Sequence, residues 1–344
     1  MKFYLSSFML PRLLFENKGL KFKLLWFLFP FSLLLSPFQP FAQVIKPSKE
    51  EPKGIFFADE PNWKDASWKQ DGFDFYIGAG AYFAGKQTAN YYNGAPNNEF
   101  KLDLIFNNKH YREEVYRILK RAYPYIDTML LRINYNTDSR YNIAMDIALG
   151  GKYRFKNNWF VELSYSFRRL SCENRFDFTF PGVPPGNKEN PNYSKWEFLL
   201  AKEDRHYIDF SVGYIFHAHH VVKPFISVGG LFSYINIKSF QIFIESDKPT
   251  FDLMAIAKNP NYIPGAPTMP NYTVWKGPGY GCSLTVGLKL AVNSMVSLDP
   301  VFQLTAASFG NGGNLPGFNT KMCLNYFAGI RLVMNDALLS KNKR

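Results

Sequence analysis

Residues 72–85, GFDFYIGAGAYFAG, decide the fold because apolar and polar or small residues alternate along them at every second position. One set contains Phe73, Phe75, Ile77, Ala79, Ala81 and Phe83, and the other contains Asp74, Tyr76, Gly78, Gly80 and Tyr82. A period of two places these sets on opposite faces of a β-strand. The apolar face then packs either on the core of a water-soluble protein or against lipid.

The composition of the whole chain favours lipid. The 344 residues include 34 Phe and 21 Tyr, and 20% of them are charged. The high apolar content excludes a disordered chain, and the lack of repeated long apolar runs excludes a helical membrane protein. Many aromatic residues combined with alternating segments are typical of a membrane β-barrel.

The single long apolar run lies near the start and predicts export. Lys21 and Lys23 precede the apolar residues 24–38, and Ala42 stands before Gln43, which is the pattern of a cleaved signal peptide. Prolines inside the run argue against an uncleaved membrane helix. We therefore expect four regions: a signal peptide at 1–42, a periplasmic segment at 43–70, a barrel at 71–333 and a short periplasmic tail at 334–344.

Seven further segments repeat the alternation of the first. They are 142–155, 159–169, 206–216, 225–234, 280–292, 296–306 and 322–333. Each is about as long as a tilted strand that crosses a membrane, roughly 9–11 residues. Pro300 interrupts the seventh strand of the set and predicts a β-bulge there, because proline cannot donate to the ladder.

The connections between these segments alternate in length. Three are short (156–158, 217–223 and 293–295), and four are long (86–140, 172–205, 239–273 and about 309–319). Outer-membrane barrels have short periplasmic turns and long extracellular loops. The sequence therefore predicts an all-β fold, a closed antiparallel eight-stranded transmembrane barrel whose apolar face meets lipid. With eight strands, both ends of the chain lie on the periplasmic side.

The predicted barrel resembles the small eight-stranded outer-membrane barrels of the OmpA/OmpX-like superfamily and their PorT-like relatives. The resemblance covers about residues 71–333 and rests on the architecture, on the glycine-rich first strand YIGAGAYFAG and on the last strand NYFAGIRLV. It implies a location in the outer membrane of a Gram-negative-type bacterium. The chain departs from the pattern at its end, where NDALLSKNKR follows the last strand in place of a closing aromatic residue.

Charged residues on the inward set of each strand predict a network inside the barrel. Five acids face five bases: Asp74, Asp146, Glu162, Asp209 and Asp299 with Lys152, Arg154, Arg168, Lys289 and Arg331. Unpaired buried charge is costly, so we expect these groups to pair across the lumen. They form either a structural plug or the lining of a path for polar solutes.

The first long loop contains a helical pattern over residues 101–120. Its apolar residues recur at helical spacings, Glu113 and Arg117 form an i,i+4 pair, and Pro124 should end the helix. The apolar stripe covers the mouth of the barrel or binds a partner. Residues 128–136 resemble a further strand, which we interpret as an extension above the membrane.

No catalytic, cofactor or metal site is predicted. His217, His219 and His220 lie at a short periplasmic turn without an acid or cysteine to complete a metal site. His206 lies near the outer rim beside Glu203 and Asp204, where an outer-membrane enzyme would place a histidine, but no nucleophile motif accompanies it. The three cysteines are odd in number and have no metal-binding spacing.

The sequence thus favours a non-enzymatic barrel with a structural or interaction role and with its loops at the cell surface. The alternatives are a small-solute channel and an enzyme acting at the extracellular rim. The expected partners are outer-membrane lipid and, through the extracellular loops, an envelope or secretion-system protein. Nucleic acid is not expected, because the basic balance of the chain suits anionic lipid headgroups.

Overall fold

A computed structural model describes residues 72–98, 100–125, 132–136, 138–155, 157–181, 192–216, 222–258, 262–264, 275–292, 296–309 and 322–335. The expected signal peptide, the whole of the expected periplasmic segment, nearly all of the tail and His217, His219 and His220 lie outside these residues. No helix in the described part of the chain is long and apolar enough to span a membrane.

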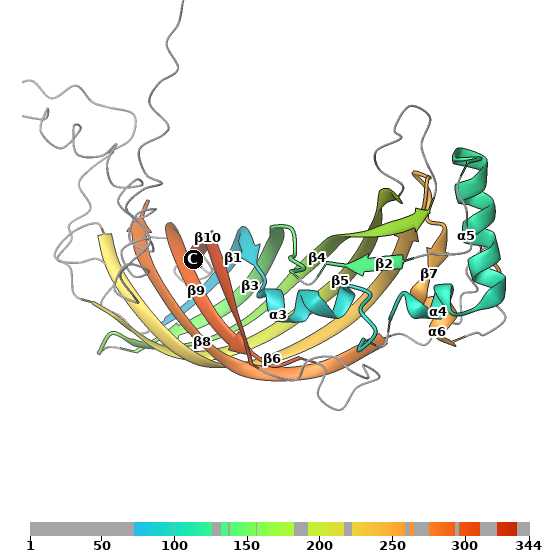
Figure 1. Cartoon of the computed structure of the whole chain (residues 1–344). Helices are drawn as coiled ribbons and strands as arrows, with labels where there is room; N and C mark the ends of the chain where they lie inside the picture. Colours follow the sequence, from blue (N-terminus) through green and yellow to red (C-terminus); the bar gives the residue numbers. More distant parts are fainter. Residues whose placement is uncertain are drawn as a thin grey trace, which may run out of the picture. The chain divides into compact units, whose positions relative to one another are not determined.

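Eight antiparallel strands close into a ring (Figure 1). They are β1 (Gly72–Phe83), β3 (Ala144–Arg154), β4 (Trp159–Pro181), β5 (Asn192–Ile215), β6 (Val222–Phe243), β8 (Trp275–Ala291), β9 (Val296–Ala307) and β10 (Cys323–Asn335). Each strand pairs with the next one of this series, and β1 pairs with β10. The predicted barrel is therefore confirmed, with every strand in its predicted place.

Strand length is where the prediction was wrong. β4, β5 and β6 run far beyond the ten or so residues expected, so that most of the predicted loop 172–205 and the first residues of the predicted loop 239–273 are strand, and β8 begins at Trp275, before its predicted start. The connection between β4 and β5 shrinks to residues 182–191. The order of short and long connections is nevertheless kept, and β1 begins beside the end of β10, since Asp74 is paired with Asn335.

The outward face of the ring is an apolar belt. On β1 the side chains of Phe73, Phe75 and Ile77 are each about half exposed, while Asp74 and Tyr76 between them are buried. The same alternation runs along β3 and β10. Because the exposed set is apolar and the buried set is polar, this is the inverse of a water-soluble β-protein and fits a barrel surrounded by lipid.

Aromatic side chains border the belt at both ends. At the end with short turns, contacting rings lie on four strands: Phe73, Tyr153, Phe155, Trp159, Tyr214 and Phe216. At the other end, Phe167, His206 and Tyr234 form one row across β4, β5 and β6. Such girdles mark the two interfaces of a membrane barrel. On β4 the belt spans about nine residues, from Trp159 to Phe167, which is enough to cross the hydrocarbon.

Polar residues take over the outward face directly beyond this row. Arg169 Nε lies 2.8 Å from Asp204 Oδ1, and Lys238 Nζ lies 3.6 Å from Asp204 Oδ2. A β-bulge lies at the same level: Lys202 pairs with Ser239 and Glu203 with Ile237, so that Lys238 is the extra residue. These charges place the end of the lipid-facing surface between Phe167 and Arg169.

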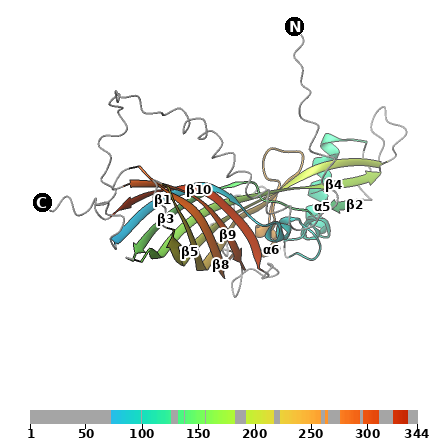
Figure 2. The ribbon, with the colours of Figure 1, turned by 90° about the vertical axis from the view of Figure 1, so that its left-hand side faces the viewer.

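Beyond the belt, β4, β5 and β6 continue as a strand extension, which we define as residues 169–181, 192–204 and 235–243 together with β2 (Arg132–Tyr135) and β7 (Phe251–Asp252). Figures 1 and 2 both show these long strands running past the other strands toward α5. β2 pairs with β4 and β7 with β6. Residues 132–135 of the strand-like segment 128–136 form β2 and pair with β4 beyond the belt, and their position above the membrane stays a prediction.

Short helices pack against the extension and the mouth of the barrel. They are α3 (Lys86–Ala89), η3 (Asn90–Tyr92), α4 (Asp103–Phe106), α5 (Lys109–Ala122) and α6 (Leu253–Lys258). α4 and α5 confirm the predicted helical segment, and the Asn108 side chain caps α5 by accepting from the amides of His110 and Tyr111. The predicted Glu113–Arg117 pair was wrong: Arg117 pairs with Glu114 at 2.5 Å.

The bulge expected at Pro300 was also wrong. The pairing of β9 with β8 ends at Gly287–Val301 and resumes at Leu290–Leu298 with the same offset. Opposite β10, Pro300 pairs with Ile330 in an unbroken register. β9 therefore accommodates Pro300 by leaving out backbone pairs with β8, and no extra residue is inserted.

Candidate functional site

All ten charged residues predicted for the lumen lie inside the ring and are buried. They are Asp74, Asp146, Lys152, Arg154, Glu162, Arg168, Asp209, Lys289, Asp299 and Arg331. They lie at successive levels along the barrel axis, and we call each level a layer. The layers are described here from the end with short turns toward the mouth.

Asp74 is the acid of the first layer. Its Oδ2 lies 2.9 Å from Arg154 Nε and 3.2 Å from Lys289 Nζ. These cations come from β3 and β8, on two sides of the strand that carries Asp74. One carboxylate thus binds two cations and ties three strands together inside the barrel.

Glu162 is the acid of the second layer. Arg331 Nη1 lies 3.0 Å from Glu162 Oε1, and Lys152 Nζ lies 3.6 Å from Oε2. The Tyr76 hydroxyl donates to Glu162 Oε1 at 2.7 Å. The Lys152 ammonium also lies 4.6 Å from the centre of the Phe160 ring. This carboxylate is therefore held by partners from β1, β3 and β10.

Arg168 is the cation of the third layer, near the mouth. It forms an ion pair with Asp146 on β3. Its guanidinium lies between the rings of Tyr82 and Tyr207, 4.0 and 4.1 Å from their centres, and the two tyrosine hydroxyls are 2.9 Å apart. A planar guanidinium stacks well on aromatic faces, so these three large side chains together cross the barrel.

Asp209 and Asp299 depart from the expected one-to-one pairing. No ion pair reaches either carboxylate within the described part of the chain; the five bases belong to Asp74, Asp146 and Glu162. Gln303 Nε2 donates to Asp209 at 3.0 Å, and the Ser297 hydroxyl donates to Asp299 at 2.8 Å. Equal numbers of acids and bases in a sequence therefore do not define the pairs.

Glycines make room for the aromatic side chains of the lumen. A Cβ at Gly150 would lie 2.3 Å from the Tyr76 ring, and one at Gly213 would lie 2.3 Å from the Phe160 ring. At these distances the rings would have to move. Small residues on some strands thus allow large ones on their neighbours, as a narrow barrel requires.

A buried polar group that the sequence analysis missed fixes the helices to the mouth. Arg205 Nε donates to Glu203 Oε1 at 2.6 Å, and Arg205 Nη2 donates to the hydroxyls of Thr88 and Tyr141 at 3.0 and 3.1 Å. The Tyr92 hydroxyl donates to Glu203 at 2.5 Å. Arg205 and Glu203 were assigned to a loop, because the outward apolar residues of β5 end at this level, where Asp204 and Lys202 follow.

An apolar cluster covers the inner face of the strand extension. Helix residues Leu102, Ile105, Phe106, Val115 and Leu119 pack with strand residues Phe176, Leu199, Ile237, Phe240 and Ile242, all of them buried. The stripe of the first long loop therefore covers the chain's own strands and mouth, and does not lie open for a partner.

Two carboxylates approach each other at the far edge of this cluster. Glu197 Oε1 and Oε2 each accept from the Glu245 amide at 3.3 Å. The carboxylate of Glu245 lies 2.8 Å from Lys195 Nζ, which also donates to the Tyr123 hydroxyl at 2.9 Å. Burial raises the pKa of Glu197 to about 7, and the charge of Glu245 adds to the rise.

The structure gives His206 a place in the aromatic girdle and not in a catalytic pair. The Tyr165 hydroxyl lies 2.7 Å from His206 Nδ1, and the Phe167 and Tyr234 rings contact the imidazole. Asp204 is occupied by Arg169 and Lys238. Across the residues that the structure describes, no three histidine, cysteine or acidic side chains gather as a metal site would require.

The ring, its outward apolar belt and its charged, buried interior decide the class of protein. The chain is an eight-stranded outer-membrane β-barrel. A closed ring leaves no unpaired strand edge in the hydrocarbon, which is the condition for a β-protein to cross a membrane. This architecture places the chain in an outer membrane, as the sequence predicted.

Comparison with solved structures finds similar chains at low sequence identity. Neisserial surface protein A (NspA) is 10% identical, with a TM-score of 0.35 over 76% of this chain and 96% of that protein. Ail of Yersinia pestis is 10% identical, with a TM-score of 0.31 over 77% and 100%. OprG from Pseudomonas aeruginosa is 10% identical, with a TM-score of 0.31 over 77% and 97%. No family model and no curated protein match the chain.

Proposed function

We propose that the chain is a non-enzymatic outer-membrane barrel with a structural or interaction role, closed to solutes by its interior and presenting the strand extension at the cell surface. The observation that carries this proposal is the layered lumen. Three successive layers of ion pairs and aromatic rings, centred on Asp74, Glu162 and Arg168, lie inside the ring and support closure of the lumen.

The arrangement at the mouth supports closure from outside. Helices α3 to α5 and the apolar cluster lie over the inner face of the extension, and Arg205 joins them to β5 through Thr88. A solute would have to displace both this packing and the charges beneath it. A charge-filled lumen with a packed cover favours a structural role over the alternative, a small-solute channel.

A liposome-swelling assay tests this proposal. Purified protein is folded into vesicles that contain an impermeant solute, and a small neutral amino acid is added outside. We expect swelling no faster than in protein-free vesicles, whereas a general porin in the same lipid gives rapid swelling. Swelling at a porin-like rate would support the channel and refute the structural role.

The interaction part of the proposal has its own test. The extension is expected to face the cell exterior, where an envelope or secretion-system protein is the proposed partner. Photo-crosslinking from a probe at Glu173, an exposed position on the outward face of β4, should capture such a protein in intact cells. The same probe at Leu163, inside the belt, should capture lipid or nothing.

A further inference from the structure

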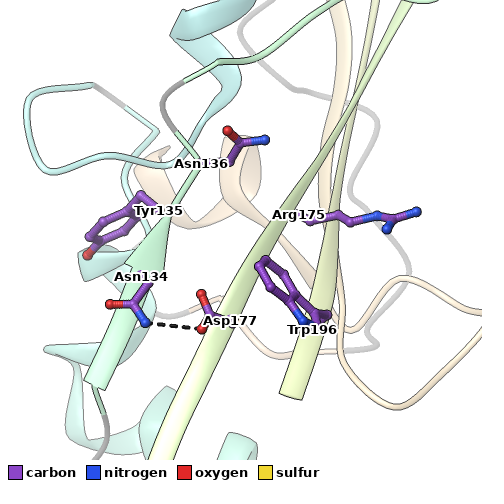
Figure 3. Close-up of a pocket in the computed structure, with 6 residues that line it drawn as sticks. All are labelled: Asn134, Tyr135, Asn136, Arg175, Asp177 and Trp196. Atoms are coloured by element: carbon purple, nitrogen blue, oxygen red, sulfur yellow. Dashed lines mark hydrogen bonds between the residues drawn. The ribbon is translucent and has the colours of Figure 1, made fainter. Parts of the chain in front are cut away.

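The outward face of the strand extension carries an open cleft with a volume of about 560 Å³. Its walls are Asn134, Tyr135, Asn136, Arg175, Asp177 and Trp196, from β2 and the residue after it, β4 and β5 (Figure 3). The volume lies within the range of roughly 300–1,000 Å³ typical of small-molecule sites. The cleft lies on the face opposite the apolar cluster and separate from the lumen.

The strand register builds this cleft row by row. Asn134 faces Asp177 across the β2–β4 ladder, and Asp177 faces Trp196 across the β4–β5 ladder. Asn134 Nδ2 donates to Asp177 Oδ2 at 3.0 Å, as Figure 3 shows. The next row on β4 and β5 is Arg175 opposite Phe198, whose ring centre lies 5.3 Å from the guanidinium. The Asn134 amide, the Asp177 carboxylate and the Trp196 indole thus stand in one row across three strands, and Arg175 stands in the next row.

Neither lipid nor the protein core accounts for Trp196. Its side chain is 58% exposed. It lies ten residues beyond His206 on β5, roughly 33 Å along the strand, and the charged row of Arg169, Asp204 and Lys238 separates it from the belt. A membrane-girdle tryptophan sits at the headgroup level, which this one does not.

We propose that the cleft binds a saccharide chain, with one sugar ring stacked on the Trp196 indole. A sugar ring has an apolar C–H face and a rim of hydroxyls that both donate and accept. The indole face suits the C–H face of the sugar. Hydrogen-bond acceptors and donors for the sugar hydroxyls come from the side chains of Asp177, Asn134, Asn136 and Arg175. The proposal rests on the surface exposure proposed above for the extension.

The chemistry of the cleft favours a saccharide over a protein partner. Among the residues that line the cleft, the aromatic side chains are those of Trp196 and Tyr135, and the other four are polar or charged. The core of a protein–protein interface is apolar and depleted of charged residues, whereas two of the six residues that line this cleft, Asp177 and Arg175, are charged. The sugar could belong to a free glycan or to lipopolysaccharide of the same membrane, and the two arms of the test separate these sources.

The first arm titrates purified protein in detergent micelles with short neutral and acidic oligosaccharides by calorimetry. Trp196→Ala should weaken binding at least roughly tenfold, and Trp196→Phe should retain most of it because a flat ring remains. Ile263→Ala, which removes an apolar side chain that is 64% exposed in the segment after α6, should bind like wild type. Heat-modifiable gel mobility confirms that each variant is folded.

The second arm places wild-type protein in nanodiscs of lipopolysaccharide that carries or lacks its core sugars. Radical oxidation of Trp196, read by mass spectrometry, should fall only when the core sugars are present if the membrane supplies the ligand. Binding in either arm supports the proposal and names the source. Absence of binding in both arms overturns it, as does a Trp196-dependent protein captured in place of any sugar. Neither result alters the swelling of vesicles, so failure here is distinct from failure of the proposed function.

Discussion

The barrel wall and the strand extension are built from the same strands with their two faces exchanged. Within the belt, β4 turns Leu163 and Tyr165 outward and Glu162 and Arg168 inward. Beyond Phe167, the same strand turns Arg169, Glu173 and Arg175 outward and Phe176 inward. The backbone and its alternation do not change. The medium that surrounds the outward face, lipid first and water after, decides which residues can stand there.

This comparison explains why the two regions are held together by different forces. The barrel interior holds charged side chains that form ion pairs or accept hydrogen bonds, because an isolated buried charge costs several kcal/mol. The interior of the extension holds Phe240, Tyr92 and Phe100, whose rings meet edge to face at 5.4 to 5.7 Å, and is stabilised as any water-surrounded core is. The same type of substitution, such as an apolar residue replaced by a charged one, should therefore affect the stability of the protein differently in the barrel and in the extension.

The largest effect is expected in the lumen, from Arg168→Met. The change leaves Asp146 buried without its cation and should lower the free energy of unfolding by roughly 3–5 kcal/mol. Replacing both partners, as Arg168→Met with Asp146→Leu, should restore much of the loss. Urea unfolding of the barrel in lipid vesicles, followed by tryptophan fluorescence, measures both. Equal losses in the single and the double variant would show that this pair does not stabilise the barrel.

A somewhat smaller effect is expected on the outward face of β4, where position decides the result. Leu163→Arg places a charge in the belt and should cost roughly 2–4 kcal/mol. Glu173→Arg places the same residue on the outward face of the extension and should change stability by less than about 0.5 kcal/mol. Heat-modifiable gel mobility after folding into vesicles compares the two. If they behave alike, the boundary between Phe167 and Arg169 is misplaced.

The belt and the lumen could be predicted from residues alone, since one rule governs all eight strands. Phe75 and Ile330 could be placed outward, and Asp74 and Arg331 inward, from alternation and composition. The partners inside the lumen could not be predicted, because the residue opposite Asp209 depends on strand stagger and the tilt of each side chain. It is Gln303 and not a base that donates to Asp209.

The strands of the extension were predicted as loops, and the reason is physical. A search for strands with an outward apolar face stops where that face becomes polar, at Arg169 on β4 and at Asn236 on β6. The bulge at Lys238 then shifts the alternation by one residue. Beyond the bulge, the apolar residues Phe240 and Ile242 again alternate with a period of two, but they face inward. The sequence therefore contained a strand pattern there, with its apolar face inward instead of outward. The row of Asn134, Asp177 and Trp196 depends on the pairing of distant segments and could not be found without the structure.

The smallest effect concerns pH and is confined to the extension. The pKa of Glu197 rises from 4.5 to about 7 on folding, so the folded state holds the proton more tightly than the unfolded one. This stabilisation is complete below pH 4.5 and is lost as the pH rises through 7, with an expected change on the order of 1 kcal/mol. Hydrogen exchange of the β5 and β6 amides should therefore show easier local opening at pH 8 than at pH 5, after correction for the intrinsic rate.

Glu197→Gln provides the control for this dependence. The amide keeps the size of the side chain and an acceptor for the Glu245 N–H, but it does not titrate. The pH dependence of opening should disappear, while the belt strands β9 and β10 should exchange alike in both proteins. A pH dependence that persists in Glu197→Gln would assign it to another group, of which Glu245 and Lys195 are the neighbours.

Single-channel recording in planar bilayers tests the central claim, a barrel closed by the side chains of its lumen, most directly. We expect wild-type protein to insert without steady conductance. The double variant Arg168→Met with Asp146→Leu removes two charges but keeps side chains that fill the layer, and should remain closed. Truncating the third layer, with Arg168, Tyr82 and Tyr207 replaced by alanine, leaves the layers of Asp74 and Glu162 in place, so this variant should also show no steady conductance. Large, steady currents through the wild-type protein would contradict the account and identify the barrel as a channel.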